Sequence, residues 1–245
     1  SNFLKRFTKN IIVMNYQSAE LSKIAINCFL MSTVSTTNVL AEICEKINAD
    51  WIKISESLRL DKRIGKFAYL KPGLGISGGN LERDLTTISN LSGRIGSFAS
   101  IFSSWKNNST YRRNWVFEKL HQKILINTKN PCITIWGLAY KENTHSVKNS
   151  PSLYLISKII NHKIAIYDPI IKKIKINGKI FYSKKKIQDS LINTDVLCIM
   201  NASSIFKEVD YNLLTKIKSK LILDPLNVIN NKKMPSDMTI ISMGK

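Results

Sequence analysis

Two polar residues, Lys23 and Asn27, stand four positions apart in a largely apolar segment. A helix turns once in about 3.6 residues, so both side chains would project from one helical face. A lysine ammonium in an apolar, partly desolvated pocket can stabilise a developing alkoxide, and the neighbouring amide can orient a substrate or a water molecule. The alternative is structural, with Lys23 at the surface and Asn27 buried and hydrogen-bonded. Taken by themselves, the two residues favour this structural interpretation.

A second candidate for chemistry is the glycine-rich stretch LKPGLGISGGNLERDL at residues 70–85. Gly73, Gly75 and Gly78 match G-x-G-x-x-G, a phosphate-binding pattern that requires a strand before it and a helix after it. No clean strand precedes these glycines, and helical patterns flank them on both sides. We therefore expect a loop that leads into a helix, with Asn80 as the N-cap, rather than a dinucleotide-binding turn. Such a helix N-terminus favours an anion or a developing negative charge.

The elements that must position these residues fall into two groups. A short strand is expected over 10–17, and residues 17–110 then show a helical pattern with apolar residues at three- and four-residue spacing. The expected helices run from Ser18 through 36–50, over 51–61, and from near Asn80 past Trp105, with a loop over 69–79.

From about residue 130 the pattern changes to apolar strands that alternate with helices. A helix is expected over 150–160, with Ser150 as N-cap and Pro151 at its first position. This alternation predicts an α/β Rossmann-like domain with a parallel, doubly wound sheet behind an all-α central domain. The expected strands are 132–140, 163–169, 194–201, 220–225 and a weaker one at 238–243.

Composition limits the classes of function. The net charge of +20 would attract polyanions, but the lysines are spread over the chain, and the densest basic segment, 172–186, lacks the interleaved aromatic residues of a nucleic-acid reader. We expect a solvated face there, and no nucleic-acid partner. The most apolar run, 24–34, is shorter than the roughly 18–20 residues of a membrane span, so no membrane partner is expected either.

Cysteine and histidine usage excludes further classes. The four cysteines are dispersed without a C-x-x-C pair and there are only three histidines, which argues against a disulfide framework and against any metal site. No signal peptide opens the sequence. A reducing compartment, the cytoplasm, is therefore expected.

Several motifs in a fixed order resemble the nucleotide-sugar dehydrogenase family, which comprises UDP-glucose, UDP-N-acetylhexosamine and GDP-mannose 6-dehydrogenases. SAELSKIAINCFL resembles the central-domain helix of that family, and ADWIKISESLRLDKRIG resembles its segment ending in D-x-R-I-G. YLKPGLGISGGNLERD resembles the active-site loop G-x-G-x-G-G-S-C-x-x-K-D, and WGLAYKENTHSVKNSPSL resembles G-x-x-F-K-x-x-T-D-D-x-R-x-S-P. AIYDP, TDVLCIMNASSIFK and LILDPLNVI follow as C-terminal landmarks.

The resemblance covers the central and C-terminal domains of the family. It implies that residues 1–16 are the end of a preceding NAD domain that is otherwise absent. Residues 17–125 would be a helical central domain for dimerisation and the active site, and residues 130–245 would be a domain that binds the sugar nucleotide.

The resemblance also implies roles for individual residues. Lys23 and Asn27 would be catalytic, Asp84 would position or activate water, and Asn80 falls where the family has its nucleophilic cysteine. Arg63 would reach a substrate across a dimer, and Lys141 would hold substrate from the C-terminal domain. Arg83 and Lys148 would meet NAD phosphate. The remaining substrate contacts would come from Tyr69, Leu70, Lys71, Pro72, Gly73 and Ser77.

Three departures from the family pattern bear on activity. Asn80 cannot form the thiohemiacetal that a cysteine forms with an aldehyde. Cys28 follows Asn27 directly and would point off that helix face, so it is not expected to substitute. His145 and Ser146 replace an Asp-Asp pair, and Leu226 replaces a late arginine.

Three hypotheses about function follow. The first is part of an NAD-dependent dehydrogenase of a UDP- or GDP-sugar, of the kind used in polysaccharide biosynthesis. It would act as a homodimer and perform a single two-electron oxidation, or a second one through a hydrated aldehyde. The second is a non-catalytic homologue that binds sugar nucleotides or dimerises. The third, a basic nucleic-acid-binding module, has only the net charge to support it.

Overall fold

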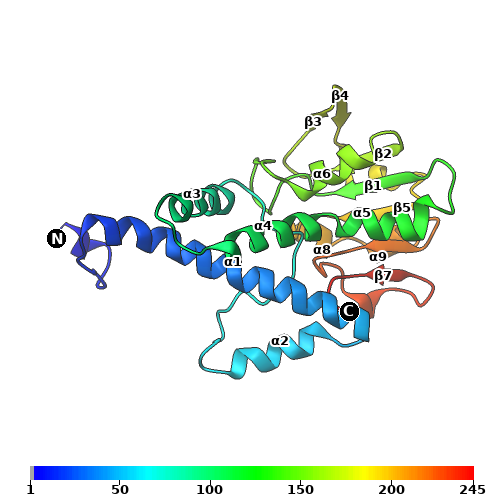
Figure 1. Cartoon of the computed structure of the whole chain (residues 1–245). Coiled ribbons are helices and arrows are strands. Elements are labelled where there is room, and N and C mark those ends of the chain that lie inside the picture. Colours follow the sequence, from blue (N-terminus) through cyan, green and yellow to red (C-terminus); the bar gives the residue numbers. More distant parts are fainter. Residues whose placement is uncertain (1–2) are drawn as a thin grey trace.

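The structure, a computed structural model, describes residues 3–245. A 3-10 turn, Leu4–Arg6, precedes the long helix α1, Tyr16–Ile47, which runs the length of the helical part in Figure 1. Helices α3 and α4 lie along one side of α1, and α2 lies along the other. The remaining bounds in this part are α2 Trp51–Leu60, α3 Asn80–Arg94, α4 Ser100–Arg113, α5 Trp115–Leu120 and a π-helical turn His121–Leu125.

Local chemistry explains both ends of α1. The side chain of Asn15 accepts a hydrogen bond from the Ser18 amide, which caps the first turn. Asn48 adopts a left-handed conformation with φ 59° and ends the helix. Buried residues Asn27, Met31, Asn38 and Ala41 line the inward face. Their spacing is that of one helical stripe, so the pattern in the sequence correctly predicts the helix.

Two predictions in this part are wrong. Residues 10–15 are irregular and no strand forms there, because nothing in the described chain pairs with this exposed segment and a lone strand leaves its backbone groups unsatisfied. The helix from Asn80 does not run past Trp105. It ends at Arg94, Gly96 follows with φ 69°, and α4 begins at Ser100, since a left-handed residue cannot continue a right-handed helix.

The expectation about membrane segments also needs correction. An 18-residue window of α1 has a mean hydropathy of 1.4, so this helix is long and apolar enough to cross a membrane by length and composition alone. One-third of that window is buried inside the protein. The two criteria differ because isolated polar residues such as Asn27 interrupt an unbroken apolar run but barely lower a mean hydropathy taken over 18 residues.

The α/β part is a parallel sheet of order β2-β1-β5-β6-β7, as the sequence predicts. Ile133 of β1 lies opposite Ile164 of β2 and Val196 of β5. One face of the sheet is covered by α5 and α6 and the other by α8 and α9, with an apolar core on each. The bounds are β1 Cys132–Trp136, α6 Pro151–Lys158, β2 Lys163–Tyr167, α7 Ile187–Ser190, β5 Val196–Ile199, α8 Ser204–Lys207, α9 Tyr211–Leu214, β6 Leu221–Leu223, a 3-10 turn Asn231–Lys233 and β7 Thr239–Ile241.

The basic segment 172–186 forms an antiparallel hairpin of β3, Lys173–Ile176, and β4, Lys179–Tyr182. Lysines face water while Ile174 and Ile176 are buried, so the predicted solvated face is one side of this hairpin. Asn177 and Gly178, both with positive φ, form its turn. An Asn-Gly pair is the usual sequence of such a turn and could have predicted the hairpin.

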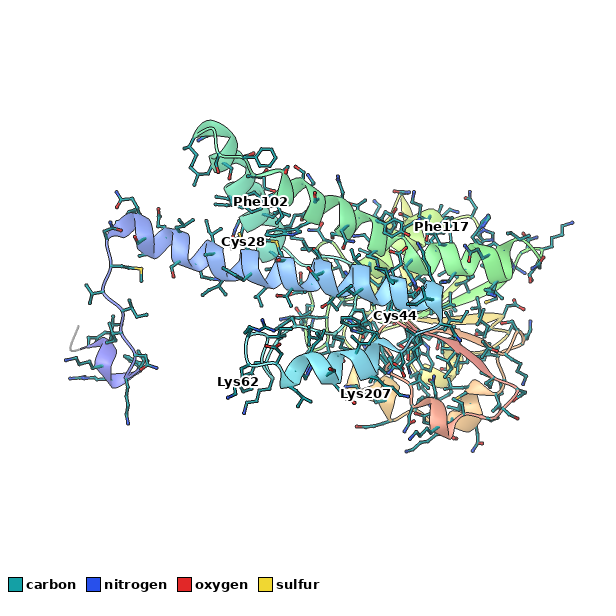
Figure 2. The ribbon with its side chains drawn as sticks, turned by 60° about the horizontal axis from the view of Figure 1, so that its bottom comes forward. Cys28, Cys44, Lys62, Phe102, Phe117 and Lys207 are labelled. Carbon is teal, nitrogen blue, oxygen red and sulfur yellow. The ribbon has the colours of Figure 1, made fainter. Side chains whose placement is uncertain are left out.

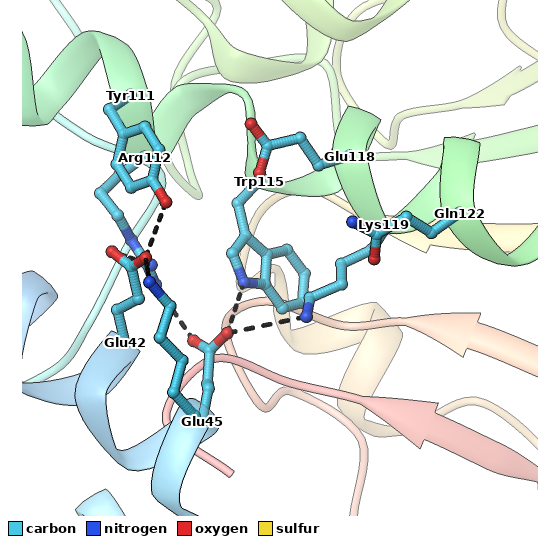
Figure 3. A pocket seen from close by; sticks show the side chains of 9 residues that line it. Glu42, Glu45, Tyr111, Arg112, Trp115, Glu118, Lys119 and Gln122 are labelled. Atoms are coloured by element: carbon cyan, nitrogen blue, oxygen red, sulfur yellow. Dashed lines mark hydrogen bonds and ion pairs between the residues drawn. The ribbon is translucent and has the colours of Figure 1, made fainter.

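A buried ionic cluster connects α1, α4 and α5 (Figure 3). Arg112 is 1% exposed and makes ion pairs of 3.4 Å to Glu42 and 3.2 Å to Glu45. The Trp115 indole donates to Glu45 over 2.9 Å. Glu45 also accepts a hydrogen bond of 3.0 Å from the Gly244 amide. This cluster ties the end of the chain to α1 and so sets the position of the helical part against the sheet.

Candidate functional site

The glycine-rich loop 69–79 lies between α2 and α3, and its first half is held by the helical part. Thr37 donates to the Tyr69 carbonyl over 3.2 Å, and the Trp51 indole donates to the Leu70 carbonyl over 2.8 Å. The Gly73 amide donates to the Asn38 side chain over 2.8 Å. Main-chain groups of the loop are therefore satisfied by side chains of α1 and α2, which fixes its path without regular structure.

The middle of the loop is held by α4. The Ile76 amide donates to the Ser109 hydroxyl over 2.7 Å, and Arg113 donates to the Ile76 carbonyl over 2.9 Å. Gly75 has φ 78° and a side chain there would collide with the Ser109 carbonyl oxygen. Glycine is required at this position by conformation and by space.

The end of the loop meets the α/β part. The Gly78 amide donates to the Lys148 carbonyl over 3.1 Å, and Asn149 donates to the Gly78 carbonyl over 2.8 Å. Gly78 has φ 78°, and a methyl group added to it would lie 2.9 Å from the Tyr140 ring. The loop thus packs into the junction of the two parts, and it does not follow a strand, which agrees with the argument against a dinucleotide turn.

The structure brings together two of the catalytic candidates. The Asn27 side chain, 7% exposed, donates to Asp84 Oδ2 over 2.5 Å. Arg83 lies 3.2 Å from Asp84 Oδ1. A buried carboxylate with an amide on one oxygen and a guanidinium on the other, next to the first turn of α3, is arranged to accept a hydrogen bond from a substrate hydroxyl or a water.

The expected environment of Lys23 is wrong for this chain. Lys23 lies one turn before Asn27 on α1 but is exposed, not in an apolar, partly desolvated pocket. The reason is that α3 begins beside Asn27 and covers only the inward stripe of α1 that carries Asn27 and Met31.

Asn80 is not the N-cap of α3. Gly79 holds that position, the helix begins at Asn80, and no side-chain cap is formed within the described residues. Asn80 is exposed. A methyl group added at Gly79 would lie 3.1 Å from the Lys148 ammonium nitrogen, so this cation sits at the positive end of α3. A helix N-terminus and a lysine side by side are suited to an anion.

The expected substrate-binding residues divide between two clefts. One of about 510 Å³ between α1 and α2 includes Arg63, Tyr69 and Leu70, with Arg63 paired to Asp61 over 2.7 Å. The other, of about 230 Å³, includes Leu70, Lys71 and Pro72 together with Leu226.

The other expected contacts, Gly73, Ser77 and Lys141, line neither of these two clefts. Gly73 has open space around it, and Ser77 is half-buried in the loop. Lys141 is exposed, with its ammonium 5.6 Å from the Tyr140 ring.

Cys28 is a half-buried thiol near Asp84. It packs with Met31, Ile76 and Leu85, on the side of α1 where Phe102 of α4 lies in Figure 2. Burial, and then the negative charge of Asp84, raise the pKa of the Cys28 thiol. A raised pKa leaves less thiolate, which is the reactive form.

The residues present fit only part of an NAD molecule. After β1, where a dinucleotide fold offers amides to a diphosphate, the Leu138 amide and the Ala139 amide instead donate to Asp168. The α/β part therefore lacks a free phosphate turn. Arg83 in the first turn of α3 and Lys148 beside Gly79 place two cations at this helix N-terminus, where a phosphate group would be attracted. No group of three metal-ligating His, Cys, Asp or Glu side chains is found among residues 3–245.

Several residues that hold the site were missed from the sequence. Asn38, Ser109 and Asn149 position the loop through their side chains. For Asn38 a signal existed, because it follows Asn27 by 11 residues, which is three helical turns on the same face. Ser109 lies in a polar stretch with no pattern that marks it.

Comparison with known proteins identifies two family domains in this chain. The central domain of the UDP-glucose/GDP-mannose dehydrogenase family matches residues 17–109, and the UDP-binding domain of that family matches residues 134–231. A UDP-glucose 6-dehydrogenase of Bacillus subtilis is 28% identical over 233 residues, which is 93% of this chain and 50% of the relative. A UDP-glucose 6-dehydrogenase of Rickettsia typhi is 28% identical over 91% of this chain and 52% of its own length.

Solved structures share the fold. A UDP-glucose dehydrogenase from Pyrobaculum islandicum has a TM-score of 0.82 at 21% identity and covers 98% of this chain, which in turn covers 54% of that structure. A UDP-D-ManNAc dehydrogenase from Pyrococcus horikoshii has a TM-score of 0.80 at 21% identity, with 99% and 57% covered. The chain spans about half the length of these relatives. On the strength of both matched domains, the chain belongs to the UDP-glucose/GDP-mannose dehydrogenase family.

Proposed function

We propose that this chain is the substrate-binding part of an NAD-dependent dehydrogenase that oxidises a UDP- or GDP-sugar. The observation that carries the proposal is the buried pair of Asn27 and Asp84 beside the first turn of α3, next to a loop that packs into the junction of the two parts. The loop and the junction would hold the sugar nucleotide, and the pair would face the reacting carbon.

In this proposal the side chains of the site have different roles. Lys23 and Asn27 stabilise the alkoxide that develops as the alcohol is oxidised. Asp84, held by Asn27 and Arg83, orients a water molecule. NAD, when bound, accepts the hydride. Arg83 and Lys148 would hold one of its phosphates.

Asn80 limits the reaction. A carboxamide cannot attack an aldehyde to form a covalent thiohemiacetal, so the chain has no nucleophile at the start of α3. We therefore expect one two-electron oxidation, which converts an alcohol to an aldehyde or ketone. A second oxidation would have to proceed through a hydrated aldehyde.

The test counts NADH formed per sugar consumed, with an NAD-binding domain joined to this chain and a panel of UDP- and GDP-sugars. A ratio of one supports the proposal. A ratio of two contradicts the single oxidation. An Asn80→Cys variant that raises the ratio from one to two would identify residue 80 as the reason.

A second candidate function is a non-catalytic protein that binds sugar nucleotides. The observations in its favour are Asn80 itself and the exposed position of Lys23. Binding of a sugar nucleotide with no NADH from any sugar on the panel would support this candidate against the first.

We further propose a homodimer formed through the helical part and a cytoplasmic location. The exposed apolar face of α1 supports the dimer. The four free thiols, Cys28, Cys44, Cys132 and Cys198, support a reducing compartment.

A further inference from the structure

A small cavity lies where α2, the loop 69–79 and the segment after β6 meet. It has a volume of about 230 Å³, and its lining includes Arg59, Lys71 and Leu226. Trp51, Pro72 and Met243 contribute much of its apolar wall. Whole small-molecule sites usually measure about 300–1,000 Å³, so this cavity fits one group of a larger ligand.

Arg59 carries an unused donor at this cavity. Its Nη1 atom is buried and has no hydrogen-bond partner among residues 3–245. A guanidinium is always charged, and buried donors are nearly always paired in folded proteins. An orphaned charged donor in the wall of a cavity therefore indicates an acceptor that binds from outside the chain.

The charge of the cavity defines the acceptor. Lys71 is a second cation in the lining, and no acidic residue in the described part of the chain lines the cavity. Asp224, adjacent to the lining residue Pro225, accepts a hydrogen bond from the Ile229 amide through Oδ2 over 2.8 Å, while its buried Oδ1 has no partner among residues 3–245. Arg59 is half-buried and Lys71 is exposed, so the cavity presents two positive charges to an anion that enters from solvent.

We propose that Arg59 and Lys71 bind the diphosphate of the nucleotide sugar. This inference rests on the proposed function for the identity of the ligand. Leu226, which stands where the family pattern has an arginine, lines the same cavity. Arg59 on α2 thus supplies from a different element the positive charge that residue 226 lacks. A fork of parallel donors matches a phosphate oxygen pair, and lysine at position 59 would not reproduce it.

The experiment is calorimetric titration of the 245-residue chain with UDP, inorganic pyrophosphate and uridine at one salt concentration. We expect Arg59→Ala and Lys71→Ala each to weaken binding of UDP and pyrophosphate at least tenfold, with no change for uridine. The matched control is Lys53→Ala, an exposed cation of α2 outside the cavity, which should bind as the wild type does. Leu226→Arg added to Arg59→Ala should restore most of the affinity, because both residues line one cavity.

The outcomes separate this inference from the proposed function. UDP binding that is equal in the wild type and in Arg59→Ala overturns the inference and leaves the function standing. Pyrophosphate binding that depends on Arg59, without binding of any UDP- or GDP-sugar, supports the anion site and overturns the function. No pyrophosphate binding to the wild type, or equal losses in Lys53→Ala and Arg59→Ala, overturns the inference. Thermal unfolding of each variant shows whether a loss of binding reflects a loss of fold.

Discussion

At the residue scale, the site depends on a few side chains whose partners are fixed by burial. Asp84 is buried and takes its hydrogen bonds from Asn27 and Arg83. A side chain at position 75 would collide with Ser109, and one at position 78 would collide with Tyr140. At Gly73 an added side chain would meet nothing within 4 Å. Close packing therefore explains the second and third glycines of the G-x-G-x-x-G pattern, but it does not explain the first.

Replacement of Asn27 by alanine should destabilise the protein. The variant leaves one oxygen of the buried Asp84 without a donor, which typically costs about 1–3 kcal/mol. Chemical denaturation of Asn27→Ala measures the change. Thr36→Ala, at an exposed position of the same helix, is the control and should fall within about 0.5 kcal/mol of the wild type. Equal stability of Asn27→Ala and wild type would contradict the pairing.

The glycines of the loop should differ in their tolerance of a side chain. Gly75→Ala and Gly78→Ala place a methyl group at positive φ and against a neighbour, so each should lower the free energy of unfolding by more than about 1 kcal/mol. Gly73→Ala meets open space and should change it little. Urea titrations of the three variants check the order. A large loss at Gly73 alone would show that the loop takes another path.

At the element scale, the middle and the end of α1 have different structural roles. One face carries Asn27, Met31 and Asn38 and packs inward. The last turns of α1 carry Glu42 and Glu45. These carboxylates bind Arg112 of α4 and the Trp115 indole of α5 (Figure 3). Glu45 also accepts a hydrogen bond from the Gly244 amide. One helix therefore positions the site near its middle and couples the helical part to the sheet at its end.

The ionic cluster at the end of α1 should make stability fall in acid. Burial opposes ionisation of Glu42, but the hydrogen bond from Tyr111, the Lys46 ion pair and the charge of Arg112 together hold the pKa of this carboxyl below its usual 4.5. A folded-state pKa below the unfolded one gives stability that is present above pH 4.5 and is lost as the pH falls through the folded value.

Glu42→Gln tests this dependence. The variant should be less stable than the wild type by about 1–3 kcal/mol at pH 7, and the difference should shrink below pH 4.5 as Glu42 is protonated in the wild type. Denaturation curves at several pH values measure it. A difference that stays constant down to the acid limit would mean that Glu42 does not titrate with folding.

At the scale of the whole molecule, the outward face of α1 is unusual for a protein that acts alone. Phe29, Leu40, Ile43 and Ile47 repeat at spacings of one face and are all exposed, Phe29 at 77%. A row of large apolar residues on one helix face is typical of an interface. It also borders the cleft that includes Arg63, which the family resemblance assigns to a substrate across a dimer.

The proposed homodimer predicts that a charge on this face separates the subunits. Phe29→Lys should shift the chain from dimer to monomer in light scattering after size-exclusion chromatography. Phe98→Lys places the same charge on an aromatic residue that is even more exposed, at 95%, in the segment between α3 and α4, and should leave the dimer intact. A wild-type chain that is monomeric at high micromolar concentration would contradict the proposal.

The sequence by itself determined the local structure. The helical stripe of α1, the strands of the parallel sheet and the Asn-Gly turn of the hairpin follow from side-chain periodicity and backbone sterics, which act over a few residues. The ordered motifs determined the family. The pattern predicts the wrong structure at residues 10–17, where a strand would need a partner strand, and at residues 95–99, where the left-handed Gly96 ends the helix.

Only the tertiary structure decided which residues meet. Asn27 and Asp84 are 57 positions apart, and Glu45 and Gly244 are 199 apart, so no local pattern contains either contact. Their pairing depends on how whole helices pack and on which polar groups must be satisfied once buried. The same packing left Lys23 exposed, moved the N-cap to Gly79, and placed Arg59 and Leu226 in one cavity. The chemistry of this site is therefore a property of the packed elements, because packing decides which polar atoms become buried and which of those find a partner.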